Sequence, residues 1–225
     1  MSNQFIQIPS LLSEKEISQL ESMIGKANFV DGKLTASFAA REVKNNLQID
    51  AADNLINEIN SFLFSIIQNS QLFQSVAIPK TVHRFLVSKY GPGQYYGWHV
   101  DGPAMGNPVV RTDLAMTIFL SDPGAYKGGE LVLQTGSGVV SLKPAKGDAI
   151  VYPCQYLHGV NTVESGERLA AVTWIQSIVK SPEQRQLLLQ LSQVHSMIAQ
   201  KDRQSAEAQL LLQTYSNLWR MWADV

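Results

Sequence analysis

The sequence predicts an α+β fold, in which a jelly-roll barrel or sandwich of short strands lies between two helical regions. Seven or eight short runs rich in β-forming residues fall between residues 79 and 180, separated by glycine-containing turns. Residues 1–78 and 181–225 instead carry apolar residues at helical spacing. We therefore expect an N-terminal helical region packed on the core, a barrel domain over 79–180 and a C-terminal helical appendage.

The N-terminal region contains two candidate helices. Ser13 and Glu16 have the spacing of a capping box, and Gly25 is a plausible end for the helix that follows them. A second helix is predicted from Ala51 to about Asn69. Both have apolar residues three or four apart, which predicts one buried face for each: Ile17, Leu20 and Ile24 in the first, and Leu55, Ile56, Ile59, Leu63 and Ile66 in the second.

The middle of the chain changes to strand-like patterns. Glycine and proline pairs break the runs, and Gly136-Ser137-Gly138 has the spacing of a hairpin turn. The predicted strands are Thr81–Tyr90, a segment leading to His99, Leu114–Leu120, Glu130–Gln134, Val139–Leu142, Ala149–Tyr152 and Leu169–Ile178.

The C-terminal region returns to helical spacing. Ser181-Pro182-Glu183-Gln184 is a strong helix start, because proline suits the first helical position and serine suits the cap. Leucines then predict one helix, and a second contains Trp219 and Trp222. These tryptophans share a helix face, and packing on the barrel or the neighbouring helix is favoured over a partner-binding role.

The amino-acid composition limits the possible classes of function. Lysine and arginine (18) nearly balance aspartate and glutamate (19), and the sequence has no block of basic residues, so a nucleic-acid backbone is not an obvious partner. The single cysteine, Cys154, excludes an internal disulfide framework and fits a reducing cytoplasm. It could be a metal ligand, but a small packed residue is favoured. We expect neither a signal peptide nor a membrane span.

His99, Asp101 and His158 are the most informative residues. Two histidines and one carboxylate form the facial ligand set of non-haem Fe(II) oxygenases, which leaves metal positions open for oxygen and a co-substrate. On a strand, residues two apart point to the same face, so His99 and Asp101 can bind one ion together. The other histidines, His83 and His195, are expected to be structural and solvated, respectively.

Arg168 strengthens this interpretation. It follows His158 at the start of an apolar, strand-like run and suits one carboxylate of a bound diacid. Together the four residues predict an oxygenase that uses Fe(II) and 2-oxoglutarate. Tyr96 and Trp98 flank the first ligand, where they could form the wall of the site or simply pack in the core.

Several stretches resemble the bacterial PKHD-type hydroxylases, relatives of the prolyl 4-hydroxylases, and the resemblance covers nearly the whole chain. They are Val43-Lys44-Asn45-Asn46, Tyr96–Gly102, Arg111–Leu114, Phe119–Pro123, Gly128–Leu131, Gly147-Asp148, Trp174–Ser177 and Asn217–Trp222. The resemblance implies a double-stranded β-helix, Fe(II) bound by the triad, 2-oxoglutarate bound by Arg168, and ascorbate as a reductant.

One position departs from that family's pattern. Many prolyl hydroxylases have a tyrosine that helps to hold 2-oxoglutarate where this chain has Phe119. Phenylalanine cannot donate a hydrogen bond, so Tyr90 or Tyr96 is expected to supply the hydroxyl. The loop from Gly102 to Val110 also departs from the family's pattern. It borders the expected metal site, which leaves the choice of substrate open.

The expected function is therefore hydroxylation of an unidentified substrate. A protein prolyl or lysyl side chain and a small metabolite both remain open, and the resemblance hints at iron or siderophore metabolism. The competing interpretations are a non-catalytic cupin-like binding protein and a nucleic-acid demethylase. A homo-oligomer through the C-terminal helices is also expected.

Overall fold

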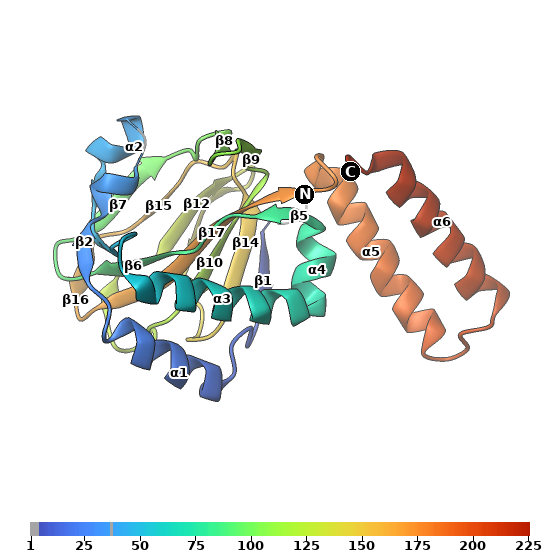
Figure 1. The fold of residues 1–225 in the computed structure, drawn as a ribbon. Helices are drawn as coiled ribbons and strands as arrows, with labels where there is room; N and C mark the ends of the chain where they lie inside the picture. The colour runs from blue at the N-terminus through green and yellow to red at the C-terminus, as the bar shows by residue number, and fades with distance from the viewer. Residues whose placement is uncertain (1–4, 37) are drawn as a thin grey trace.

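Two facing antiparallel β-sheets form the centre of the computed structural model, which describes residues 5–36 and 38–225 (Figure 1). The larger sheet runs in the order β1 (Ile6–Ile8), β14 (Ala149–Pro153), β10 (Leu114–Phe119), β17 (Arg168–Ser177), β6 (Leu86–Tyr90), β4 (Leu47–Ile49) and β2 (Phe29–Asp31), with β5 (Pro79–Val82) also paired to β17. The smaller sheet runs in the order β13 (Gly138–Leu142), β12 (Leu131–Thr135), β15 (His158–Val160), β7 (Tyr95–His99) and β3 (Lys44–Asn45). The predicted jelly roll is confirmed.

Shorter elements connect and flank these sheets. Two small ribbons pair β8 (Ala104–Met105) with β9 (Val110–Arg111), and β11 (Lys127–Gly128) with β16 (Val163–Ser165). The 3-10 helix η1 (Gly32–Thr35) and the helix α2 (Phe38–Glu42) precede β3. Of these segments, η1, α2 and β8 contribute residues to the cavity that holds the candidate site.

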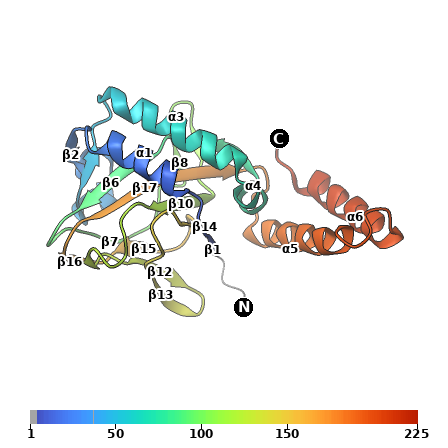
Figure 2. The same cartoon turned by 90° about the horizontal axis from the view of Figure 1, so that it is seen from below.

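Helices cover the outer face of the larger sheet. They are α1 (Glu14–Ile24), α3 (Asn54–Asn69) and α4 (Gln71–Ala77), and α1 and α3 lie together over that face (Figure 2). Along β10, Met116 and Ile118 pack in the cluster that these helices complete, whereas Ala115 and Phe119 pack between the sheets. All residues of β10 are buried because both of its faces are covered.

The two N-terminal helices begin with side-chain caps. The capping box of Ser13 and Glu16 is present and Gly25 caps the other end of α1, as predicted. The second helix starts at Asn54 and not at Ala51. Asp53 is the cap, and its carboxylate accepts a hydrogen bond from the Leu55 amide at 2.9 Å, so the preceding residues form a turn.

The structure differs from the expected strands in two places. The first 78 residues supply β1 to β4 as well as helices, and the boundaries at 78/79 and 180/181 stay predictions. The expected strand over Thr81–Tyr90 is divided at His83–Phe85. There, the buried Asn60 side chain accepts from the Phe85 amide at 2.6 Å, and Thr173 donates to the His83 carbonyl at 2.6 Å. These side chains replace ladder bonds that a continuous strand would make.

The helices α5 (Pro182–Ala199) and α6 (Ala206–Trp222) form a hairpin that projects away from the sheets (Figures 1 and 2). Ser181 caps α5, as predicted. Trp219 and Trp222 pack at the base of the hairpin with a buried cluster of Ile78, Val179 and Leu188. The tryptophans therefore hold the hairpin to the barrel. Among the described helices, none has the length and apolar character to span a bilayer.

Candidate active site

His99, Asp101 and His158 meet at one end of the barrel. His99 ends β7 and lies directly opposite His158, the first residue of β15, in the strand register. One candidate ligand atom from each of the three side chains lies within 4.8 Å of the others. Asp101 lies beyond the end of β7 and not on the strand, so the chain turns there to bring its carboxylate to the histidines.

The main chain fixes the orientation of both imidazoles. The Nδ1 atom of His99 is 2.8 Å from the Gly97 carbonyl oxygen, and that of His158 is 2.9 Å from the Tyr156 carbonyl oxygen. A carbonyl only accepts, so each Nδ1 carries the proton and donates it. The Nε2 atoms then keep their lone pairs, which is the form that binds a metal ion.

Burial favours the neutral forms of both His99 and Asp101. It lowers the pKa of His99 to about 3, with a further contribution from the charge of His158, so the His99 imidazole is neutral at physiological pH. Burial raises the pKa of Asp101 and so favours the protonated carboxyl over the carboxylate that binds a metal. The Trp174 indole and the Cys154 thiol approach the carboxylate and lower its pKa.

The Asp101 carboxylate lacks a full set of partners. Its Oδ2 atom is buried without a hydrogen bond of good geometry, and it is 3.6 Å from Nε2 of His158. With the His158 proton on Nδ1, two electron-rich atoms face each other there. A buried charge is costly unless it is paired or bound to a metal, so this donor set fits a divalent cation.

Arg168 is a buried cation on the same cavity. Its guanidinium carbon lies 5.1 Å from the Tyr90 ring centre and 5.5 Å from that of Phe119. A Cβ atom at Gly129 would lie 3.1 Å from Cδ of Arg168, so glycine makes room for this side chain. Among the described residues Arg168 has no ion-pair partner, and its Nε has no hydrogen bond. A permanently charged, buried group of this kind favours a bound anion.

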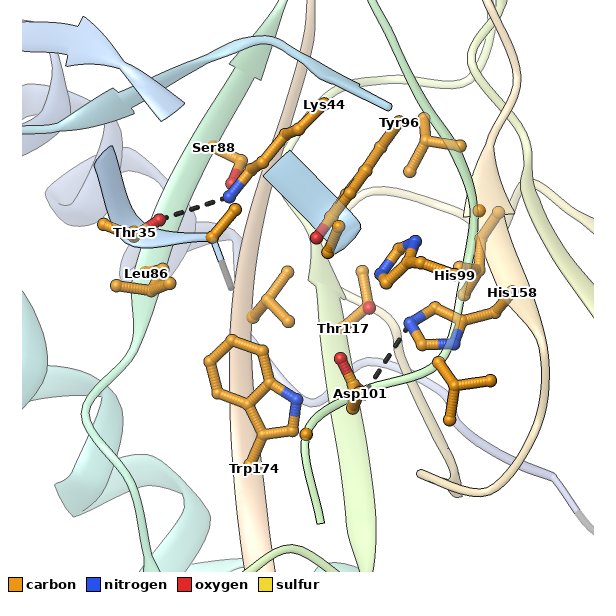
Figure 3. Close-up of a pocket in the computed structure, with 18 of the residues that line it drawn as sticks. Thr35, Lys44, Leu86, Ser88, Tyr96, His99, Asp101, Thr117, His158 and Trp174 are labelled. Atoms are coloured by element: carbon orange, nitrogen blue, oxygen red, sulfur yellow. Dashed lines mark hydrogen bonds and ion pairs between the residues drawn. The ribbon is translucent and has the colours of Figure 1, made fainter. Parts of the chain in front are cut away.

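The triad and Arg168 line one cavity of about 370 Å³, a size typical of small-molecule sites (Figure 3). Alternate residues of β17 and β6 point into it because side chains alternate along a strand. Its walls include Thr35, Lys44, Leu86, Ser88, Tyr90, Tyr96, Ala104, Met105, Thr117, Tyr152, Val172 and Trp174.

Comparison with known proteins identifies the family. Residues 85–176 match the family model of the 2OG-Fe(II) oxygenase superfamily. PKHD-type hydroxylases from Crocosphaera subtropica, Thermosynechococcus vestitus and Maricaulis maris are 36%, 39% and 40% identical to the chain. The alignments cover 97%, 98% and 97% of this chain, respectively, and 99% of each relative. The chain belongs to the PKHD-type hydroxylases.

Solved structures share the fold of this PKHD-type hydroxylase at low sequence identity. A prolyl-4-hydroxylase from Pseudomonas putida is 16% identical with a TM-score of 0.53, over 78% of this chain and 94% of that one. A Trichoplax adhaerens prolyl hydroxylase in complex with a hypoxia inducible factor peptide is 16% identical, with a TM-score of 0.55, over 77% and 84% of the two chains.

The tyrosines expected near the co-substrate both line the hydroxylase cavity. The Tyr96 ring stacks on His99 with centroids 3.7 Å apart, and Tyr90 lies against the Arg168 guanidinium. Burial raises the pKa of both hydroxyls, which therefore stay protonated and can donate hydrogen bonds. Phe119 packs against Arg168 through its ring and offers no hydroxyl.

The remaining candidate residues lie outside the group of His99, Asp101 and His158. Cys154 is buried beside Asp101, and burial raises the pKa of its thiol, which favours the protonated form over the metal-binding thiolate. His83 lies in the break between β5 and β6, and His195 is partly exposed on α5. Trp98 is 45% exposed on the outer side of β7, so the expectation of a wall or core position for it was wrong.

Sequence reasoning missed several cavity residues of the hydroxylase. Trp174 and Thr117 could have been found from strand alternation, since they lie an even number of residues from Arg168 and Phe119. Tyr152, whose ring meets His158 edge-on at 5.2 Å, belongs to a run that reads as ordinary core. Lys44 had no such signal, because its two-residue strand is too short to show a period.

Proposed function

We propose that this chain is an Fe(II)- and 2-oxoglutarate-dependent hydroxylase in which His99, Asp101 and His158 hold the metal. The observation that carries the proposal is the meeting of two Nε2 lone pairs with an incompletely paired, buried carboxylate oxygen. These groups are the ligand set of non-haem Fe(II) oxygenases. Family membership supports the same chemistry.

In this proposal Arg168 binds the distal carboxylate of 2-oxoglutarate. The guanidinium can form two parallel hydrogen bonds with that group, and it has no competing carboxylate among the described residues. Tyr90 and Tyr96 are the candidate donors of the hydroxyl that Phe119 cannot supply. Arg168 would meet this carboxylate at the barrel wall. The rings of Tyr90 and Phe119 pack against the guanidinium and fix its direction.

When bound, Fe(II) would use O2 to couple the oxidative decarboxylation of 2-oxoglutarate to hydroxylation of a C–H bond: one oxygen atom would enter succinate, the other would enter the product, and carbon dioxide would leave. The protein's own part is to position and to shield. His99 stays neutral across physiological pH because of its low pKa, so the ligand set does not lose an imidazole to protonation. The cavity walls, including the buried Tyr152 and the half-buried Trp174, exclude water from the reacting groups.

The substrate is proposed only by class. A prolyl or lysyl side chain and a small metabolite are both compatible with the cavity, and a link to iron or siderophore metabolism remains a hypothesis. Ascorbate as a reductant, a cytoplasmic location and a homo-oligomer are further expectations. Exposed apolar residues on α5 and α6 support an oligomer contact through these helices: Leu187, Val194, Met197, Leu210, Leu212 and Met221.

The deciding experiment supplies Fe(II), 2-oxoglutarate and oxygen and measures succinate formation and the mass gain of one oxygen atom across a metabolite and peptide panel. Succinate formation that depends on all three would support the hydroxylase. Metal and small-molecule binding without succinate would favour the cupin-like binding protein. Oxidative removal of a methyl group from a methylated oligonucleotide would favour the nucleic-acid demethylase, which the chain's near-zero net charge does not support.

A further inference from the structure

Lys44 is a second buried cation in the active-site cavity. Its side chain lines the cavity, and the residue is only 4% exposed. Figure 3 shows Lys44 reaching into the cavity beside Thr35, with Tyr96 between it and the metal-binding histidines. Tyr96 contacts both neighbours: its ring centre is 5.1 Å from Nζ of Lys44 and 3.7 Å from the His99 ring centre.

The Lys44 ammonium has few partners for a buried charge. Nζ donates to the Thr35 hydroxyl at 3.2 Å, and this is its single hydrogen bond to the described residues. None of the carboxylates that the structure describes lies within 4.0 Å of it. Burial lowers the pKa of Lys44 to about 8, although the charges of Asp31 and Asp101 oppose this shift. An ammonium carries three donors, so two remain for a ligand.

Thr35 is itself oriented by its neighbours. Its hydroxyl accepts from Lys44, and its own proton can go to the Gly32 carbonyl oxygen at 3.1 Å or to Oε1 of Gln48. Gln48 is in turn held by a hydrogen bond of 3.0 Å to Ser88 on β6. This chain of contacts fixes the direction of the ammonium without neutralising its charge.

The co-substrate does not account for this second cation. In the proposed site, one carboxylate of 2-oxoglutarate meets the metal and the other meets Arg168, so both of its negative groups are already paired. Lys44 comes from β3 on the smaller sheet, whereas Arg168 comes from β17 on the larger sheet. The cavity lining also includes the small residues Ala36, which follows Thr35 in the chain, and Ala40, which leave room for another molecule.

We propose that Lys44, held by Thr35, binds a carboxylate or a similar anionic oxygen group of the molecule that is hydroxylated. The inference rests on the proposed function, because that function assigns Arg168 to 2-oxoglutarate. Lys44 is buried as a residue and lines the cavity, so the anionic group enters the cavity to reach it. This favours a small carboxylate-bearing molecule or a free chain end over a side chain within a folded protein.

The test measures binding to protein loaded anaerobically with Fe(II) and saturating 2-oxoglutarate. The probes are three pairs, each a carboxylate and its amide: hexanoate and hexanamide, phenylacetate and phenylacetamide, and N-acetylproline and N-acetylprolinamide. We expect at least one carboxylate to bind about tenfold or more tightly than its amide by titration calorimetry, about 1.4 kcal/mol. Lys44→Met, which keeps the apolar stem, removes that preference, and Lys44→Arg retains part of it.

Controls separate the possible failures. Lys15→Met, at an exposed lysine of α1, is expected to keep the carboxylate preference. Thr35→Val, which preserves shape and removes the hydroxyl, is expected to weaken the preference and tests the subsite even where Lys44→Met fails to fold. No preference in any pair, or an unchanged preference in Lys44→Met, overturns the proposal. A loss of 2-oxoglutarate affinity in Lys44→Met also overturns it, by placing Lys44 in the co-substrate site. Failure of wild type to bind Fe(II) or 2-oxoglutarate would instead refute the proposed function.

Discussion

The barrel cavity buries charged side chains, whereas the C-terminal hairpin exposes apolar ones. Arg168 and Lys44 are 2% and 4% exposed. On the hairpin, Met197, Leu210 and Met221 are 65%, 64% and 74% exposed. Both regions depart from the usual distribution of polar and apolar groups between surface and interior.

The two departures do not carry equal weight. A buried charge without a partner costs far more free energy than an exposed apolar side chain, and scattered exposed leucines or methionines are common on protein surfaces. The cavity therefore indicates ligands of definite charge, while the hairpin indicates only a surface available for contact. Each of the following predictions tests one side of this contrast.

The largest effect is expected at the proposed metal ligands. His99→Ala or His158→Ala removes one of three ligands, so Fe(II) affinity should fall by more than about 100-fold, beyond the loss typical of a residue that only supports a ligand. Turnover should be abolished. Anaerobic titration with Fe(II) measures the affinity, and His195→Ala on α5 is the matched control. Wild-type affinity in either triad variant would contradict the assignment.

The next effect concerns Arg168. Arg168→Ala should cost about 2–5 kcal/mol of 2-oxoglutarate binding, because a charge-assisted pair is lost. This corresponds to an affinity loss of at least about tenfold. Titration with 2-oxoglutarate measures it, and Arg203→Ala at an exposed arginine should behave as wild type. Unchanged dependence on 2-oxoglutarate would show that another residue holds the carboxylate.

A smaller effect follows from the pKa of Lys44. Its value is lowered from 10.5 to about 8 in the folded protein, so between these pH values the unfolded chain binds more protons. Raising the pH through this window should therefore stabilise wild type relative to Lys44→Met, by up to about 3 kcal/mol. Denaturant unfolding of both proteins at pH 8 and 10.5 measures the change. A difference in unfolding free energy that does not change with pH would show that folding does not lower the pKa of Lys44.

The smallest effect on stability is expected on the hairpin. Replacing Leu210 and Met221 by glutamine should change the free energy of unfolding by no more than about 0.5 kcal/mol per site, because both are exposed. If the hairpin forms the oligomer contact, the variant should be monomeric where wild type is not, with unchanged Fe(II) affinity. Light scattering measures the mass, and a monomeric wild type would remove the basis for the proposed contact.

The sequence predicted the parts of the site that depend on short patterns. His99, Asp101 and His158 were found from their residue types, and the capping residues Ser13 and Ser181 marked helix starts correctly. Such patterns need only neighbouring residues, so they can be recognised without knowledge of the tertiary structure. The barrel itself followed from the regular spacing of strands and turns.

Other features depend on contacts between distant parts of the chain. Lys44 reaches the cavity because β3 pairs with β7, which places it opposite Tyr96, and no local pattern encodes that pairing. The break at His83–Phe85 depends on Asn60, which belongs to α3. The short strands β1 and β2 gain their stability from the sheet that they join, so their own residues show no clear period.

The carbonyl groups of Gly97 and Tyr156 have a wider consequence. Each aims the imidazole two residues further along the chain, at 2.8 and 2.9 Å. Because both acceptors are main-chain atoms, replacing a side chain elsewhere in the cavity does not remove the hydrogen bonds that orient the two proposed metal-binding nitrogens. Side chains on the substrate-facing wall could therefore be replaced to change specificity while these main-chain acceptors stay available to orient His99 and His158.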